Sequence, residues 1–263
     1  ENATAHALLP LLLERGYAGC PDMTALTKRL AGLYGADLEV DGRAMGARRN
    51  LCVSVTGIKS RFALAGEDLA AAYAELALGV AFHPCMDDDG FEAGALAIEK
   101  QMLRQSLEDE LNDKRLYCAR QAARVFFGES PMGIRQEGYL EEVDALTGAD
   151  VAAAYAEMLR TASIELMVLG CTPAQTERVA AAFLAELAAV RRAPAVLPPF
   201  MAMPRQTPVR RSEAFEMEQA KLCMVFTLGR PMELADMAAF RLAMALYGGS
   251  VTSRLFLHLR ERD

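Results

Sequence analysis

Few residues of this chain could do chemistry, and the first of them are the neighbours Glu14 and Arg15. They follow the apolar run ALLPLLL at 7–13, which is typical of a helix that enters a hydrophobic core. A carboxylate at this place can act as a general base or bind a metal ion, whereas a guanidinium keeps its proton and carries only positive charge. Without neighbouring histidines, these two residue types therefore favour ion pairing over metal binding.

Glu14 occupies the place of the general base in the zinc motif H-x-x-E-H. In that motif two histidines four residues apart share one face of a helix and bind the metal. Here Leu11 and Arg15 fill both histidine positions. A catalytic zinc needs three protein ligands, and a +1 and a +2 charge about 4 Å apart repel by roughly 8 kcal/mol at a dielectric of about 20. We therefore expect no zinc and no catalytic residue at this helix.

The histidines and cysteines form no recognisable catalytic or metal-binding motif. The histidines are His6, His83 and His258, and the cysteines stand at 20, 52, 85, 118, 171 and 223. No two cysteines have the C-x-x-C spacing, and nothing in the sequence places a histidine beside a cysteine. We expect buried, reduced thiols, as in a cytoplasmic protein.

The composition limits the class of protein and of partner. The 263 residues are 52% apolar, which is enough for a sizeable core, and the formal net charge is −7. A negative net charge argues against nucleic acid and against an anionic membrane surface as binding partners. No apolar run approaches the roughly 18 residues of a membrane span, because Glu186 interrupts the longest one.

The pattern of apolar residues predicts helices alternating with a few strands. Asp22 is the predicted N-cap of the second helix, and Thr172 with Pro173 begins a later one. The predicted helices cover 3–14, 23–34, 66–82, a long segment after 91, 114–127, 148–160, a segment from 172 and one around 233–249. The predicted strands surround the polar connection 41–50 and form two apolar runs, 163–171 and 221–229.

Prolines divide the chain. Five of the eleven lie at 194, 198, 199, 204 and 208, which predicts a linker at 196–210. We therefore expect a first domain at 1–195 and the beginning of a similar, incomplete domain at 211–263. The order of elements at 3–34 recurs weakly at 234–262, which indicates a duplicated architecture. We also expect the chain to be part of a longer protein.

Several stretches together resemble the pitrilysin/insulinase-type (inverted zincin) metallopeptidases, in particular the branch that includes the mitochondrial processing peptidase. LLLERGYAG at 11–19 is similar to the zinc helix and its glycine turn, and EKQMLRQSLEDELNDK at 99–114 to the second metal helix. The stretch from VFFGESPMG at 125 to LMVLG at 170 resembles a family segment of helix then strand. LYGGSVTSRLFLHLRE at 246–261 is similar to a segment early in the family's second half.

The resemblance implies an α+β fold, an α/β sandwich with helices packed on a mostly antiparallel sheet. In such peptidases the third zinc ligand is a glutamate seven residues after another glutamate on the second metal helix. Carried over, Glu99 matches the first glutamate and Ser106 stands at the ligand position. With Leu11 and Arg15, all three ligand positions are changed and only Glu14 is kept. Arg15 is expected to supply positive charge near Glu14 or near a carboxylate of the second helix.

The implied function is that of an inactive, zinc-free homologue or subunit of such an endopeptidase. It would bind peptide, which in this family adds as a strand to a sheet edge, here near 36–42, and it would pair with a catalytic subunit or with a second copy of itself. The alternative is an active zinc endopeptidase with unusual ligands such as His6 or His83. A third hypothesis is a scaffold subunit without a peptide chamber.

Overall fold

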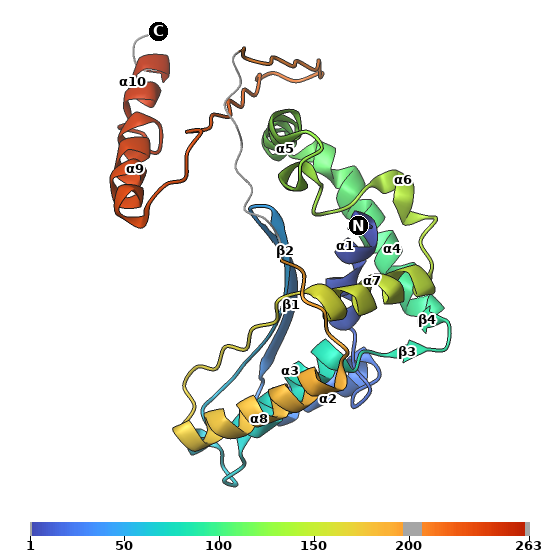
Figure 1. Ribbon diagram of the computed structural model, residues 1–263. Helices are drawn as coiled ribbons and strands as arrows, with labels where there is room; N and C mark the ends of the chain where they lie inside the picture. The colour runs from blue at the N-terminus through green and yellow to red at the C-terminus, as the bar shows by residue number, and fades with distance from the viewer. Residues whose placement is uncertain (1, 197–206, 261–263) are drawn as a thin grey trace. The chain divides into compact units, whose positions relative to one another are not determined.

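The computed structural model describes residues 2–196 and 207–260, and most of the predicted linker at 196–210 lies outside this part of the chain. The described residues form two compact units, one from 2–196 with 211–223 and the other from 207–210 with 224–260. Helices alternate with short antiparallel strands (Figure 1), which confirms the predicted α+β class.

The first unit is organised around α1 (Ala3–Leu13), which is buried along most of its length. Asn2 accepts a hydrogen bond from the Ala5 backbone N–H and so begins the helix. α1 packs against α4 (Ala93–Asp109), α7 (Gly148–Thr161) and the strand β1 (Asp37–Met45). A helix that is apolar on all sides needs such a cover, because any exposed side would leave leucines in water.

The strands that flank the predicted connection form an antiparallel hairpin. β1 pairs with β2 (Arg48–Thr56), from Asp37 opposite Thr56 to Met45 opposite Arg48. The strands run further into the polar connection than predicted and leave only residues 46 and 47 between them. Leu38 and Val40 are buried on one face. A second small sheet joins β3 (Met86–Asp87) to β4 (Gly90–Phe91).

Helix caps fix the other helices where the sequence predicts them. Asp22 caps α2 (Met23–Gly32), and capping boxes begin α7 at Thr147 and α8 (Pro173–Ala189) at Thr172. α8 packs along α3 (Leu69–Phe82). The remaining elements of the first unit are α5 (Lys114–Phe127), α6 (Leu140–Val143) and 3-10 turns at Ser60–Phe62, Glu110–Asn112 and Pro131–Gly133.

Two predicted strands are wrong. Residues 164–169 and 221–228 belong to no helix or strand, and the buried strand expected at 163–171 instead exposes Met167 and Leu169, each at 84%. An apolar run favours an extended backbone, but a strand forms only where a neighbour accepts and donates the ladder hydrogen bonds. The described residues provide no such neighbour for either run.

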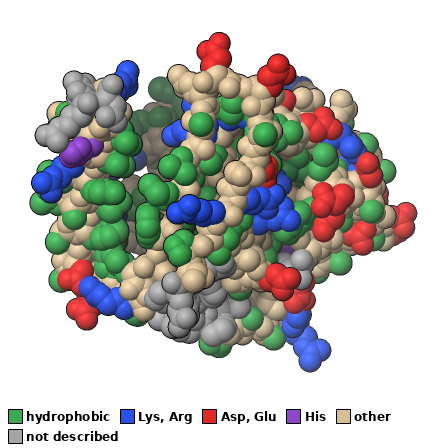
Figure 2. All heavy atoms as spheres, turned by 90° about the horizontal axis from the view of Figure 1, so that it is seen from above, with side chains coloured by type: hydrophobic (Ala, Val, Ile, Leu, Met, Phe, Trp, Pro, Cys, Tyr) green, Lys and Arg blue, Asp and Glu red, His purple; other side chains and the backbone are tan. Residues whose placement is uncertain are grey.

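The second unit contains α9 (Leu234–Tyr247) and α10 (Arg254–Arg260), which contact each other. α9 occurs where the sequence predicts a helix. Neither helix buries a large apolar side chain within the described residues. Hydrophobic side chains are widespread on the molecular surface in Figure 2. The core therefore belongs to the first unit, whose buried cluster runs from Ala5 to Tyr155.

Candidate functional site

The end of α1 brings Arg15 to the second metal helix predicted from the resemblance. Arg15 Nη1 lies 2.7 Å from Glu99 Oε1 of α4, and this carboxylate is 11% exposed. Glu99 is on the inner side of α4, beside the buried Leu96 and Leu103. A buried carboxylate needs a charged or hydrogen-bonding partner, and Arg15 is the one that the structure supplies.

Glu14 lies among carboxylates. Partial burial raises the pKa of its carboxyl group, and the negative charges of Glu39, Glu99 and Asp37 raise it further. β1 brings Glu39 and Asp37 to this place, and α4 brings Glu99. A carboxylate with a raised pKa can accept a proton from a reacting group.

Leu11 and Ser106 are not part of this cluster. Leu11 is half-buried and packs against the core, whereas Ser106 is exposed on α4. Ser106 stands seven residues after Glu99, about 10 Å along the helix. Of the five predicted site positions, the structure therefore brings Glu14, Arg15 and Glu99 together and leaves the other two outside.

The described residues hold no group of three or more histidine, cysteine, aspartate and glutamate side chains placed to bind a metal ion. His83, one of the two alternative ligands, pairs instead with Glu186 of α8, with 2.9 Å between Nε2 and Oε2. A single imidazole with one carboxylate is short of the ligands that a catalytic zinc needs.

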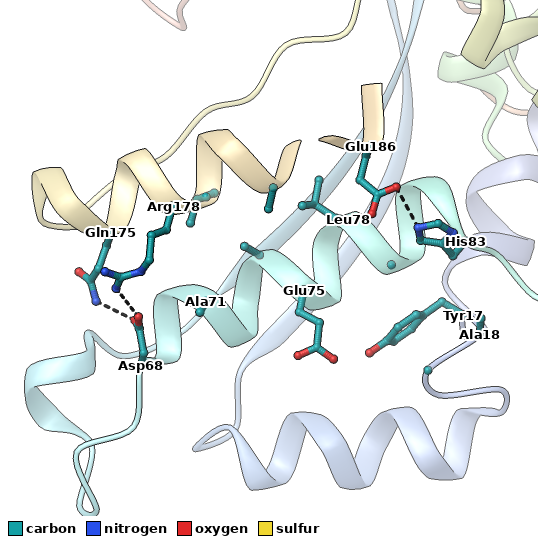
Figure 3. Close-up of a pocket in the computed structure, with 15 residues that line it drawn as sticks. Tyr17, Ala18, Asp68, Ala71, Glu75, Leu78, His83, Gln175, Arg178 and Glu186 are labelled. Carbon is teal, nitrogen blue, oxygen red and sulfur yellow. Dashed lines mark hydrogen bonds and ion pairs between the residues drawn. The ribbon is translucent and has the colours of Figure 1, made fainter. Parts of the chain in front are cut away.

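A cavity of about 410 Å³ lies between α3 and α8 beside Tyr17 (Figure 3). Apolar side chains of α3, among them Ala71 and Leu78, line it. At one end Asp68 forms an ion pair with Arg178, and at the other His83 lies within hydrogen-bonding distance of Glu186. Gln175 also donates a hydrogen bond to Asp68 over 2.9 Å. The cavity can hold a small apolar group, and none of the five predicted site positions lines it.

Tyr17 packs tightly beside this cavity. Its ring is so close to Gly19 and Gly79 that a Cβ atom at either glycine would lie 2.5 and 2.4 Å from it. Burial and the neighbouring Cys20 raise the pKa of the phenol to about 12, so the hydroxyl stays protonated. Tyr17 therefore offers the cavity a packing surface and no phenolate at neutral pH.

Sequence reasoning missed this cavity because its paired polar side chains come from distant segments. His83 and Glu186 are 103 residues apart, and Asp68 and Arg178 are 110 apart. One signal was present, because Glu186 interrupts an otherwise apolar helical run. A charge at such a position indicates a partner on the facing helix.

Comparisons with known proteins agree with the resemblance stated from the sequence. Residues 145–263 match the family model described as the peptidase M16 inactive domain. Along 262 residues the chain is 22% identical to the "Probable inactive metalloprotease YmfF" of Bacillus subtilis (strain 168). The alignment covers 100% of the chain and 61% of that relative, so the chain spans less than two thirds of its length.

Two crystal structures share the fold. One is a conserved protein from Enterococcus faecalis V583, with a TM-score of 0.77, 23% identity, and coverage of 99% of this chain and 61% of that one. The other is a peptidase M16 inactive domain from Pseudomonas fluorescens, with a TM-score of 0.64, 18% identity, and coverage of 99% and 59%. The M16 peptidases are the pitrilysin/insulinase type, so the predicted resemblance to a non-catalytic member of this type is confirmed. The comparisons do not test the mitochondrial-processing-peptidase branch.

Proposed function

We propose that this chain, a homologue of the inactive M16-type metalloproteases whose residues 145–263 match their inactive-domain model, binds extended peptide without cleaving it and pairs with a catalytic relative. The observation that carries the proposal is the ion pair between Arg15 and Glu99. A guanidinium that cannot lose its proton stands where the resemblance places a zinc ligand, and it neutralises the carboxylate beside it.

The peptide-binding part of the proposal is supported by the hairpin. The sheet that contains β1 and β2 has only these two strands among the described residues, so each strand has an edge without a strand partner. Such an edge accepts an extended chain through backbone hydrogen bonds. Asp37 and Glu39 of β1 raise the pKa of Glu14 by their charge, which supports a peptide edge at 36–42 close to the helix that the resemblance matches to the zinc helix.

Metal content tests the non-catalytic part. Chain purified from zinc-supplemented medium should hold far less than one zinc by elemental analysis. About one zinc per chain, lost on Glu14→Gln, would establish the alternative of an active enzyme with unusual ligands.

Restoring the ligands tests the site alignment. Leu11→His, Arg15→His and Ser106→Glu together should create zinc binding. The double change Leu11→His with Arg15→His is the matched comparison, because Glu99 already lies next to residue 15. Zinc binding by the double variant would assign the third ligand to Glu99 in place of position 106. No binding by either variant would reject α1 as the counterpart of a zinc helix.

Reconstitution tests the pairing. A family relative with an intact H-x-x-E-H should cleave an unstructured peptide faster when the two proteins are mixed than when it acts alone. The variant Glu14→Gln of this chain should support that activity equally well, because the catalytic zinc belongs to the partner. A mixture no more active than the relative alone, with this chain remaining monomeric or pairing only with itself, would contradict the proposal.

A further inference from the structure

The side-chain amide of Gln136 occupies part of the edge of β1. Its Oε1 accepts a hydrogen bond from the Ala44 backbone N–H over 2.6 Å, and its Nε2 donates to the Gly42 carbonyl. An amide that accepts from one residue and donates to the residue two positions away reproduces the pairing that a neighbouring strand would make. Gln136 therefore stands in for a strand at this place.

The register of the hairpin shows which backbone groups point to that edge. Met45 and Arg48 flank a two-residue turn, and such flanking residues exchange both hydrogen bonds. Because the pattern alternates, the backbone N–H and C=O groups of the odd-numbered residues of β1 point toward β2, and those of the even-numbered residues point away from it. Of these, Gly42 and Ala44 are taken by Gln136, whereas Leu38 and Val40 have no partner for their outward groups within 2–196 and 207–260.

The loop that carries Gln136 is held firmly in place. Arg49 of β2 donates to the Ala3 carbonyl over 2.9 Å and to the Arg135 carbonyl over 3.0 Å. Arg135 forms an ion pair with the buried Glu110. On the other side of Gln136, Glu137 forms an ion pair with Arg120 of α5. Both neighbours of Gln136 are anchored, so the fold itself holds the Gln136 amide against the edge of β1.

We infer that Gln136 sets the length of the peptide-binding edge. An extended peptide added to β1 pairs with Leu38 and Val40, and its ladder stops at Gly42 because the Gln136 amide occupies the next positions. The inference rests on the proposed peptide-binding function, but the closing of the edge by Gln136 can be measured without any peptide.

Hydrogen exchange of the Ala44 backbone amide measures whether Gln136 closes this part of the β1 edge. In Gln136→Ala the Ala44 N–H loses its acceptor, so its hydrogen exchange should become roughly tenfold faster. Gln101→Ala changes an exposed glutamine of α4, is the matched control and should leave the Ala44 rate unchanged. An unchanged Ala44 rate in Gln136→Ala, with hairpin amides still protected, would overturn the inference.

Binding of peptides of two lengths tests whether the added ladder ends at Gly42. Fluorescein-labelled peptides of alternating Thr and Val with terminal Lys, about five and about nine residues long, serve as probes. The unaltered chain should bind both with similar affinity, and Gln136→Ala should bind the longer one at least about fivefold more tightly, since two more ladder bonds form. If the unaltered chain and Gln136→Ala prefer the longer peptide over the shorter one by the same factor, the length limit would be overturned. Absence of binding by either protein would overturn the proposed function, and the exchange rate would still decide the closing.

Discussion

At the scale of residues, Arg15 sets the charge at the end of α1. It places a fixed positive charge 2.7 Å from Glu99, so the inner carboxylate of α4 is paired with a cationic side chain. The neighbouring Glu14 has no such partner among the described residues and lies in the field of three carboxylates. The two adjacent residues therefore contribute to stability with opposite sign at neutral pH.

Removing the guanidinium should be costly. Arg15→Ala leaves Glu99 charged and nearly buried, which is expected to lower the free energy of unfolding by about 1–3 kcal/mol. Arg15→Ala combined with Glu99→Gln should recover part of that loss. Arg29→Ala breaks the exposed pair with Glu75 and should cost less than about 1 kcal/mol. Urea unfolding of the four proteins gives the comparison, and equal losses for Arg15 and Arg29 would show that the inner pair has no special weight.

Neutralising Glu14 should stabilise the chain in a pH-dependent way. A carboxyl group whose pKa is raised in the folded state binds its proton more tightly there than in the unfolded chain. Its ionisation therefore lowers stability as the pH rises from the usual value of 4.5 through the raised one. Glu14→Gln removes this loss.

The expected gain is below about 1 kcal/mol at pH 7, because solvent screens a half-buried charge, and it should vanish near pH 4. Thermal unfolding at both pH values measures it. Glu129→Gln changes an exposed carboxylate and is the control. A gain that is larger at pH 4 than at pH 7 would contradict the assigned direction of the pKa.

At the scale of elements, glycine decides how closely α3 approaches the turn after α1. The Tyr17 ring fills the space above Gly79, and the tyrosine is only 5% exposed. α2 also contains a glycine, Gly32, but no atom lies within 4 Å of where its Cβ would stand. The same substitution should therefore have opposite effects in two neighbouring helices.

Gly79→Ala should destabilise the chain by about 1–3 kcal/mol, because the buried ring has nowhere to move. Gly32→Ala should stabilise it by up to about 1 kcal/mol, because alanine favours helix and restricts the unfolded chain. Chemical denaturation followed by circular dichroism measures both. A stabilising Gly79→Ala would show that Tyr17 can leave its position without cost.

At the scale of the whole molecule, stability is concentrated in the first unit. The buried cluster joins α1, the β1–β2 hairpin, α3, α4 and α7, whereas α9 and α10 expose most of their apolar side chains. No helix within the described ranges is long and apolar enough to cross a membrane. The apolar faces of the second unit are thus surface features of the chain as the structure describes it.

Equivalent truncations in the two units should differ in cost. Leu76→Ala empties a fully buried position of α3 and should lower the free energy of unfolding by about 2–5 kcal/mol. Leu242→Ala shortens a side chain that is 63% exposed on α9 and should change it by less than about 0.5 kcal/mol. Urea titration of both variants gives the comparison. A large loss for Leu242→Ala would mean that α9 is packed against other protein in solution.

The sequence alone determined the helices, the hairpin and the family resemblance, because these depend on local signals. Caps at Asp22, Thr147 and Thr172 are read within four residues, and the apolar periodicity is read within two turns. The absence of a zinc-ligand set at Leu11 and Arg15 follows from residue types alone, since neither side chain can bind the metal.

Only the tertiary structure decided which of these residues meet. Arg15 reaches Glu99 across 84 positions, and Gln136 reaches β1 across more than 90, because packing of α1, α4 and the 135–137 loop brings them together. The runs at 163–171 and 221–229 failed as strands for the same reason. A helix satisfies its own hydrogen bonds, whereas a strand needs a partner whose position no local pattern specifies.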